Sequence, residues 1–174
     1  MSETTEELAT AVSGLGEELS EMGVLAGQMV EQAGELSEEA GGHGWHGIAT
    51  RMQEAGEALE AAVVTLGQSQ QACENAATEL RMINDEIPAA EVAGHLGTCS
   101  TELGVAVTEA QNAGEKIEEA QTAVSDIGQE GLMQATSDLH GQLTELQERL
   151  AEQQTTSDSE QVQAEEYAKR QTGN

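Results

Sequence analysis

The sequence predicts an all-α protein, an antiparallel four-helix bundle built from two helical hairpins. Three observations lead to this class: apolar residues recur in alternating steps of three and four, short breaks separate these runs, and the acidic residues are mostly Glu. Steps of three and four place side chains on one face of a helix. Of the 33 acidic residues 29 are Glu, which forms helices better than Asp. A length of 174 residues is typical of one domain.

The first helix is expected over about residues 5–40. Two heptad rows of apolar residues alternate along it: Leu8, Val12, Leu15, Leu19, Met22, Ala26, Met29, Ala33, Leu36 and Ala40. The sequence GGHGWHG, residues 41–47, follows directly. Clustered glycines end helices and permit positive φ, so a turn is expected there.

The second and third helices are expected over about residues 48–86 and 90–127, on either side of Pro88, the only proline. The second ladder comprises Ile48, Met52, Ala55, Leu59, Ala62, Leu66, Ser69, Cys73, Ala76, Leu80, Ile83 and Ile87. The third comprises Val92, Leu96, Cys99, Leu103, Ala106, Ala110, Ala113, Ile117, Ala120, Val124 and Ile127. Glycines and other small residues flank the ladders. This favours a closely packed multi-helix bundle over a two-stranded coiled coil, which carries long charged residues at those positions.

The fourth helix is expected over about residues 131–152, after the break GQEG. Its shorter ladder comprises Leu132, Leu139, Leu143, Leu146 and Leu150. These four helices place one bundle within residues 1–152. Residues 153–174 are polar, with Val162 and Tyr167 as their only large apolar side chains, so an acidic, disordered tail is expected there. A short helix formed against a partner stays open as an alternative.

Charge and hydropathy limit the partners and the location expected of this protein. A net charge of −27 argues against nucleic acid and anionic lipid, because both need clustered Lys or Arg. No run approaches the roughly 18–20 apolar residues of a membrane span. The N-terminal residues lack the basic and apolar regions of an ordinary signal peptide. Localisation therefore stays open between the cytoplasm and secretion without a signal peptide.

Trp45 is the only Trp, and it stands in the turn between two long ladders, followed by His46 and Gly47. This W-x-G in a helical hairpin resembles the WXG family of small proteins secreted by type VII (ESX) systems. The resemblance covers residues 5–87, and the family motif carries over to Trp45 and Gly47. It implies a helical hairpin with W-x-G in its connecting turn. Physically, Trp would pack across the end of the hairpin, and Gly would permit the tight backbone.

Two features depart from the family pattern. A second hairpin, about residues 90–152, has no W-x-G, and it could stand where a separate partner chain normally packs. The family's C-terminal export signal, Y-x-x-x-[D/E], would begin at Tyr167, but its last position holds Gln171. Tyr167 is therefore the candidate residue for contact with export machinery or a partner, and export itself stays open.

Cys73 and Cys99 both occupy ladder positions on the two arms flanking Pro88. In an antiparallel pair such positions fall within about a turn of each other, so a disulfide is conceivable. Two buried, reduced thiols acting as small apolar fillers are the favoured interpretation. His43 and His46 are too few for a metal site, which needs three or four converging ligands. No nucleophile motif, phosphate loop or dinucleotide fingerprint occurs, so no enzyme and no cofactor are expected.

The leading hypothesis is a non-enzymatic, WXG-like helical protein that binds a helical partner or itself, as a type VII secretion substrate or as the partner of one. An alternative is an intracellular coiled-coil structural or adaptor protein whose apolar ladder pairs with another chain. A third hypothesis is an acidic mimic of nucleic acid that occupies basic clefts.

Overall fold

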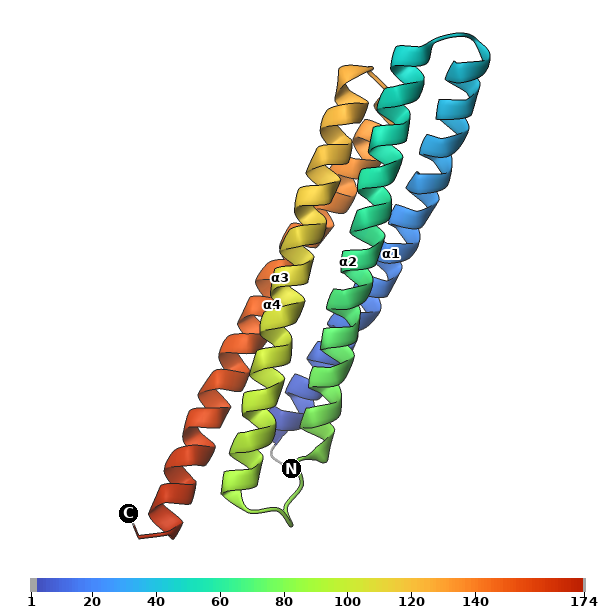
Figure 1. Cartoon of the computed structure of the whole chain (residues 1–174). Coiled ribbons are helices and arrows are strands. Elements are labelled where there is room, and N and C mark those ends of the chain that lie inside the picture. Colours follow the sequence, from blue (N-terminus) through green and yellow to red (C-terminus); the bar gives the residue numbers. More distant parts are fainter. Residues whose placement is uncertain (1–2, 174) are drawn as a thin grey trace. The chain divides into compact units, whose positions relative to one another are not determined.

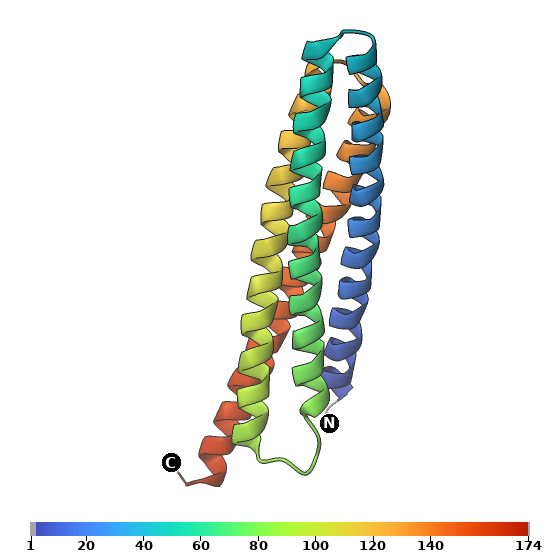
Figure 2. The same ribbon diagram turned by 45° about the vertical axis from the view of Figure 1, so that its right-hand side comes forward.

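The computed structural model describes residues 3–173, which form four α-helices and no strand (Figure 1). The helices are α1 (Glu3–Gly42), α2 (His46–Met82), α3 (Ala89–Asp126) and α4 (Glu130–Gln171). Short connections join them, so consecutive helices run antiparallel. Figures 1 and 2 both show α1 and α2 as neighbours on either side of their turn. The predicted all-α four-helix bundle is therefore confirmed.

The helices contribute to two compact units. Unit 1 comprises the described residues of Met1–Glu18, Ser69–Thr108 and Gln147–Asn174. Unit 2 comprises Leu19–Gln68 and Glu109–Leu146. Each unit therefore contains a segment of all four helices. Unit 1 includes the α2–α3 connection, and unit 2 includes the α1–α2 and α3–α4 turns.

The apolar ladders form the core of each unit. Nearly all of their side chains are buried, and Leu19, Leu59, Leu103 and Leu143 have no exposed surface. The incompletely buried ladder residues lie near helix ends: Leu36, Ile48, Ile87, Val92 and Ile127. A fully buried aliphatic side chain contributes about 1.5–3 kcal/mol, so the ladders supply the main stabilisation although Phe is absent.

The end of α2 differs from the prediction, because the helix stops at Met82 instead of about residue 86. The side chain of Asn84 accepts a hydrogen bond from Glu86 N at 2.9 Å and donates one to the Met82 carbonyl. An Asn side chain that bonds nearby backbone groups stabilises a turn in place of helix. Pro88 also disfavours helical backbone at the residue before it. These two local effects outweigh the apolar spacing of Ile83 and Ile87.

The prediction of a disordered tail over residues 153–174 is wrong, because α4 continues to Gln171. Ser157 explains why the helix stays packed: it has no exposed surface, it donates a hydrogen bond to the Leu96 carbonyl at 3.0 Å, and it accepts one from the Ser100 hydroxyl at 2.9 Å. Ser157 lies seven residues after Leu150, so the heptad position continues with a small polar residue.

Glycines on α3 make room for glutamines on α4 within unit 1. A Cβ atom built on Gly97 would lie 3.1 Å from Gln161 Nε2, and one on Gly104 would lie 3.1 Å from Gln154 Nε2. The amide of Gln154 also reaches the Ser100 carbonyl at 3.4 Å. Small and polar residues thus hold the extension of α4 against α3. A search for apolar periodicity does not detect such residues, so the helix was not predicted there.

Several basic side chains connect different helices. Arg149 on α4 forms an ion pair with Glu18 on α1, and Arg81 on α2 donates to the Ser13 hydroxyl on α1. Arg51 on α2 lies 3.4 Å from the Asp126 carboxylate on α3. These side chains are nearly half exposed, so each pair contributes at most about 1 kcal/mol. Among residues 3–173, no helix combines the length and apolarity of a membrane span.

Candidate functional site

The turn around Trp45 lies in unit 2 and has a defined backbone geometry. Trp45 N donates to the Ala40 carbonyl at 2.8 Å, and Gly44 N donates to the Gly41 carbonyl at 3.0 Å. Gly44 has a φ of +76°, which an L-residue rarely adopts. This pair of hydrogen bonds with a left-handed glycine is the Schellman motif that ends many helices. The turn therefore presents Trp45 directly before the first residue of α2.

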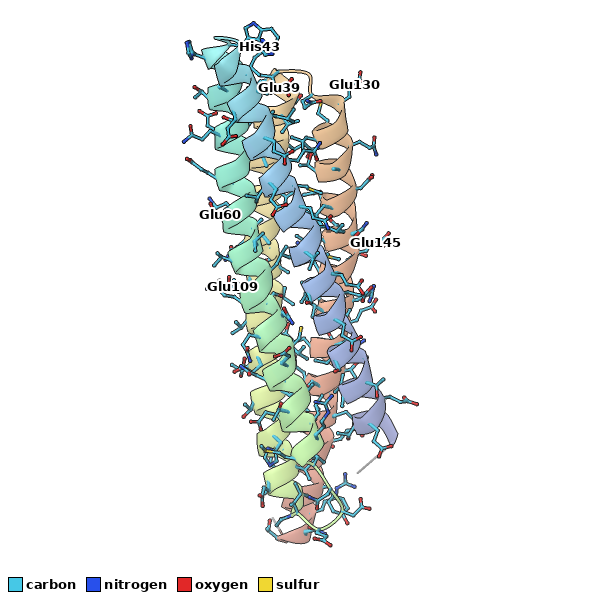
Figure 3. All side chains as sticks on the ribbon, turned by 90° about the vertical axis from the view of Figure 1, so that its right-hand side faces the viewer. Glu39, His43, Glu60, Glu109, Glu130 and Glu145 are labelled. Carbon is cyan, nitrogen blue, oxygen red and sulfur yellow. The ribbon has the colours of Figure 1, made fainter. Side chains whose placement is uncertain are left out.

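The indole of Trp45 is largely on the surface. It is 56% exposed, and it stacks on the imidazole of His43 with the ring centroids 4.7 Å apart and the planes inclined by 25°. Figure 3 shows His43 at this turn, beyond Glu39 on α1. Exposed Trp side chains are uncommon, and they often mark binding surfaces because one ring buries a large apolar area. More than half of Trp45 is therefore exposed, so it covers the end of the hairpin only in part.

A cavity of about 280 Å³ lies beside the indole within unit 2. Its apolar lining comprises Leu36, Ala40, Trp45, Ile48, Met52 and Ile127. Gly128 and Gln129 of the α3–α4 turn also border it. Ile48 is 41% exposed and Trp45 56%, so two exposed apolar side chains border the cavity, together with the acidic Glu39.

The backbone near this cavity is held by three interactions. The Ser37 hydroxyl on α1 donates to the Ala49 carbonyl on α2 at 2.9 Å. The α3–α4 turn repeats the Schellman geometry: Gly128 has a φ of +66°, Gln129 N donates to the Val124 carbonyl, and Gly128 N donates to the Ser125 carbonyl. The cavity walls are therefore anchored near both turns of unit 2.

Gly47 does not have the role expected from the W-x-G motif. It is the second residue of α2, its φ is not positive, and a Cβ atom built on it would meet nothing within 4 Å. The tight backbone is made by Gly44 instead. Because Gly47 has no side chain, the first turn of α2 beside the indole is uncovered at this position. The structure shows no other role for Gly47.

Tyr167 lies in unit 1, on the last turns of α4, and is 54% exposed. It borders a cavity of about 430 Å³ whose apolar walls include Ile83, Val92 and Leu96. Gln171, the position where the export signal would require an acidic residue, is the last residue of α4. Tyr167 and Trp45 belong to different units, so the candidate residues form two separate local sites.

Cys73 and Cys99 are free thiols in the core of unit 1, and each has no exposed surface. Burial raises the pKa of Cys73 from 9.0 to about 12, with smaller contributions from Glu74 and Cys99. Burial also raises the pKa of Cys99, to about 11, although the nearby Ser157 hydroxyl acts in the opposite direction. Thiols with raised pKa values react slowly, because the thiolate is the nucleophile. Both cysteines pack as small apolar side chains.

The histidines outside the turn form pairs with glutamate. His95 on α3 lies 2.7 Å from Glu79 on α2, and His140 on α4 lies 3.0 Å from Glu118 on α3. Within the part of the chain that the structure describes, no three His, Cys, Asp or Glu side chains converge as metal ligands. These contacts join neighbouring helices.

Sequence reasoning missed the stacking partner His43 and the contribution of the α3–α4 turn to the cavity. Gly44, directly before Trp45, could have indicated the stacking. A left-handed glycine that ends a helix keeps the residues on either side of it at the helix end, here His43 and Trp45. The contribution of Ile127, Gly128 and Gln129 had no local signal, because it depends on how the second hairpin packs on the first. Comparison of the chain with protein-family models, curated proteins and solved structures found no match.

Proposed function

We propose that this chain is a non-enzymatic, WXG-like helical protein that acts by binding other proteins, as a substrate of type VII secretion or as the helical partner of one. The observation that carries the proposal is the exposed Trp45 in the turn of a long helical hairpin. Trp is among the residues that contribute most to protein interfaces, and the neighbouring Ile48 and cavity extend the apolar surface.

The second hairpin fits this proposal. The ladders of α1 and α2 are buried against those of α3 and α4 inside each unit, so the second hairpin takes the place that a partner chain occupies in a two-chain bundle. This burial favours a self-contained bundle over an adaptor whose ladder pairs with another chain. A monomer in sedimentation equilibrium is therefore expected.

The proposal is tested by expressing the protein in a host that carries a type VII system, with and without the ATPase of that system. We expect the protein in the medium only when the ATPase is present. Trp45→Ala and Tyr167→Ala should each reduce export to about a tenth or less, in line with loss of an interface anchor. Val162→Ala is the matched control, because Val162 is on the same segment as Tyr167 and is equally exposed at 54%.

Each variant is first checked for native helicity by circular dichroism, so that misfolding is not read as loss of export. Protein that stays in the cells in both backgrounds would refute the secretion proposal. Equal export of the wild type and Trp45→Ala would refute the role of the turn while leaving secretion intact.

A further inference from the structure

The cavity beside Trp45 differs from the cavities of unit 1 in the charge of its lining. Its one ionisable side chain is Glu39 on α1. Three cavities of unit 1 each combine acidic with basic side chains, the basic ones being Lys169, Arg170 and Arg149 respectively. The cavity of unit 2 therefore has a carboxylate in its wall and no cation beside it.

No side chain of residues 3–173 neutralises Glu39, because its carboxylate forms no ion pair with any of them. Arg51 precedes the cavity-lining Met52, but it lies 2.9 Å from Glu54 and 3.4 Å from Asp126 instead. Neither Arg51 nor a histidine lines the cavity. A cation that enters this cavity therefore meets an unpaired carboxylate.

Glu39 also sets the sign of the charge in this cavity. It lines the cavity together with Gly128 and Gln129, so it lies on the side of α1 that faces the α3–α4 turn (Figure 3). Each of the two turns joins the C-terminus of one helix to the N-terminus of the next, so the opposite partial charges of the helix ends largely cancel. The remaining charge of the lining is negative, which favours a cationic occupant.

The size and the apolar walls of the cavity suit a long aliphatic side chain. Its volume of about 280 Å³ lies below the roughly 300–1,000 Å³ of pockets that take drug-sized ligands, so it fits one side chain. Lys and Arg bury an aliphatic stem against apolar surface while their charged group stays at the rim. Trp is the best aromatic partner of a cation. His43 stacks on the indole but does not line the cavity, so it does not cover the part of the ring that borders it.

We infer that this cavity receives a Lys or Arg side chain of a partner protein. The aliphatic stem packs against Leu36, Ile48 and Ile127, and the charged group pairs with Glu39 beside the indole of Trp45. The inference rests on the proposed binding role of the Trp45 turn and names the residue type that the partner inserts there. It does not depend on secretion.

Trp45 is the only Trp, so its fluorescence reports on this cavity without a label. The probes are short Ala peptides with blocked termini whose central residue is Lys, Arg, norleucine or Glu, titrated into the full-length protein at about 0.15 M NaCl. Norleucine has the aliphatic stem of Lys without its charge. We expect a saturable change with Lys and Arg, with the Lys peptide binding at least about fivefold more tightly than the norleucine peptide. The Glu peptide should bind at least about tenfold more weakly than the Lys peptide.

Two neighbouring substitutions separate the carboxylate of the cavity from the net charge of the chain. Glu39→Gln removes the cavity carboxylate at an exposed position, so the fold should be kept while the preference for Lys over norleucine falls to about twofold or less. Glu38→Gln is the matched control, because Glu38 is also exposed on α1 but does not line the cavity. It changes the net charge equally and should keep the wild-type preference within about 1.5-fold. Free N-acetyltryptophanamide, titrated in parallel, corrects for collisional quenching.

Three outcomes would overturn the inference. Equal binding of the norleucine and Lys peptides to the wild type would assign the cavity to an apolar side chain. Equal loss of the Lys preference in Glu38→Gln and Glu39→Gln would assign that preference to the net charge. The absence of a saturable change with every peptide would mean that the cavity takes no side chain. None of these outcomes alters the export of the wild type, so failure of this inference is distinguishable from failure of the secretion proposal.

Discussion

Replacing Ser157 tests whether the end of α4 is a packed part of the bundle. The Ser157 hydroxyl has no exposed surface and takes part in two hydrogen bonds, one to the Leu96 carbonyl and one from Ser100. In Ser157→Ala the first bond is lost, and the largely buried Ser100 hydroxyl loses its acceptor. A lost hydrogen bond costs about 0.5–1.5 kcal/mol and an unsatisfied buried donor about 1–3 kcal/mol.

Together the two costs span about 1.5–4.5 kcal/mol. The expected loss of unfolding free energy is about 2 kcal/mol, in the lower part of this range, because Ser100 can turn its hydroxyl to the carbonyl of Leu96 four residues earlier and recover part of the energy. For a protein of this length the melting temperature should fall by about 4–8 °C. Thermal and urea unfolding followed by circular dichroism measure this change. Hydrogen exchange of residues 151–171 locates it, since their protection should fall most.

Ser159→Ala is the matched control, because Ser159 has the same side chain two positions along α4 but is exposed. It should change the unfolding free energy by less than about 0.5 kcal/mol. Equal stability of Ser157→Ala and Ser159→Ala would refute the packing argument. Exchange of residues 153–171 in the wild type at the rate of an unstructured peptide would restore the tail expected from composition.

Four further predictions follow, two on the thiols, one on the glycines and one on the charge. Cys73 and Cys99 should react with a disulfide reagent at about pH 8 at least about a hundredfold more slowly in the native than in the denatured protein. Both thiols have folded pKa values above 9.0, so the unfolded thiols lose their protons first. The stability linked to these thiols should therefore be retained below about pH 9 and fall between about pH 9 and 12 in a pH series of urea unfolding. Gly44→Ala should destabilise by about 1–2 kcal/mol at its positive φ, whereas Gly67→Ala should stabilise by up to about 1 kcal/mol, and the same sign for both in urea unfolding would contradict this. Raising NaCl from about 0.01 to 0.5 M should increase the melting temperature, because salt screens repulsion at a net charge of −27, and a decrease would mean that ion pairs dominate.

Most of the fold was predictable because the relevant signals are local. Strict heptad spacing puts apolar side chains on one face of a helix whatever the helix packs against. Glycine clusters and Pro88 interrupt backbone hydrogen bonding at fixed points of the chain. The ladder residues are therefore buried as expected, and three of the four helices end within a few residues of their predicted bounds.

The end of α4 could not be assigned from apolar periodicity. Ser69, which sits within the second ladder, is also fully buried, and its hydroxyl donates to the Ala106 carbonyl at 2.7 Å. Leu66 before it and Cys73 after it made Ser69 readable as a ladder position. No apolar ladder residue follows Leu150 at the spacing that would mark Ser157 as a ladder position. Its burial depends instead on the face of α3 that carries Gly97 and Ser100.

The sequence by itself determined that this protein is helical, where its helices turn, and that a single Trp occupies one of those turns. Tertiary structure alone decided that Trp45 stacks on His43 beside a cavity and that Gly44 makes the turn. The physical reason is that helix formation and termination depend on residues within a few positions. Exposure, cavities and the partners of polar groups depend on which distant helix lies opposite.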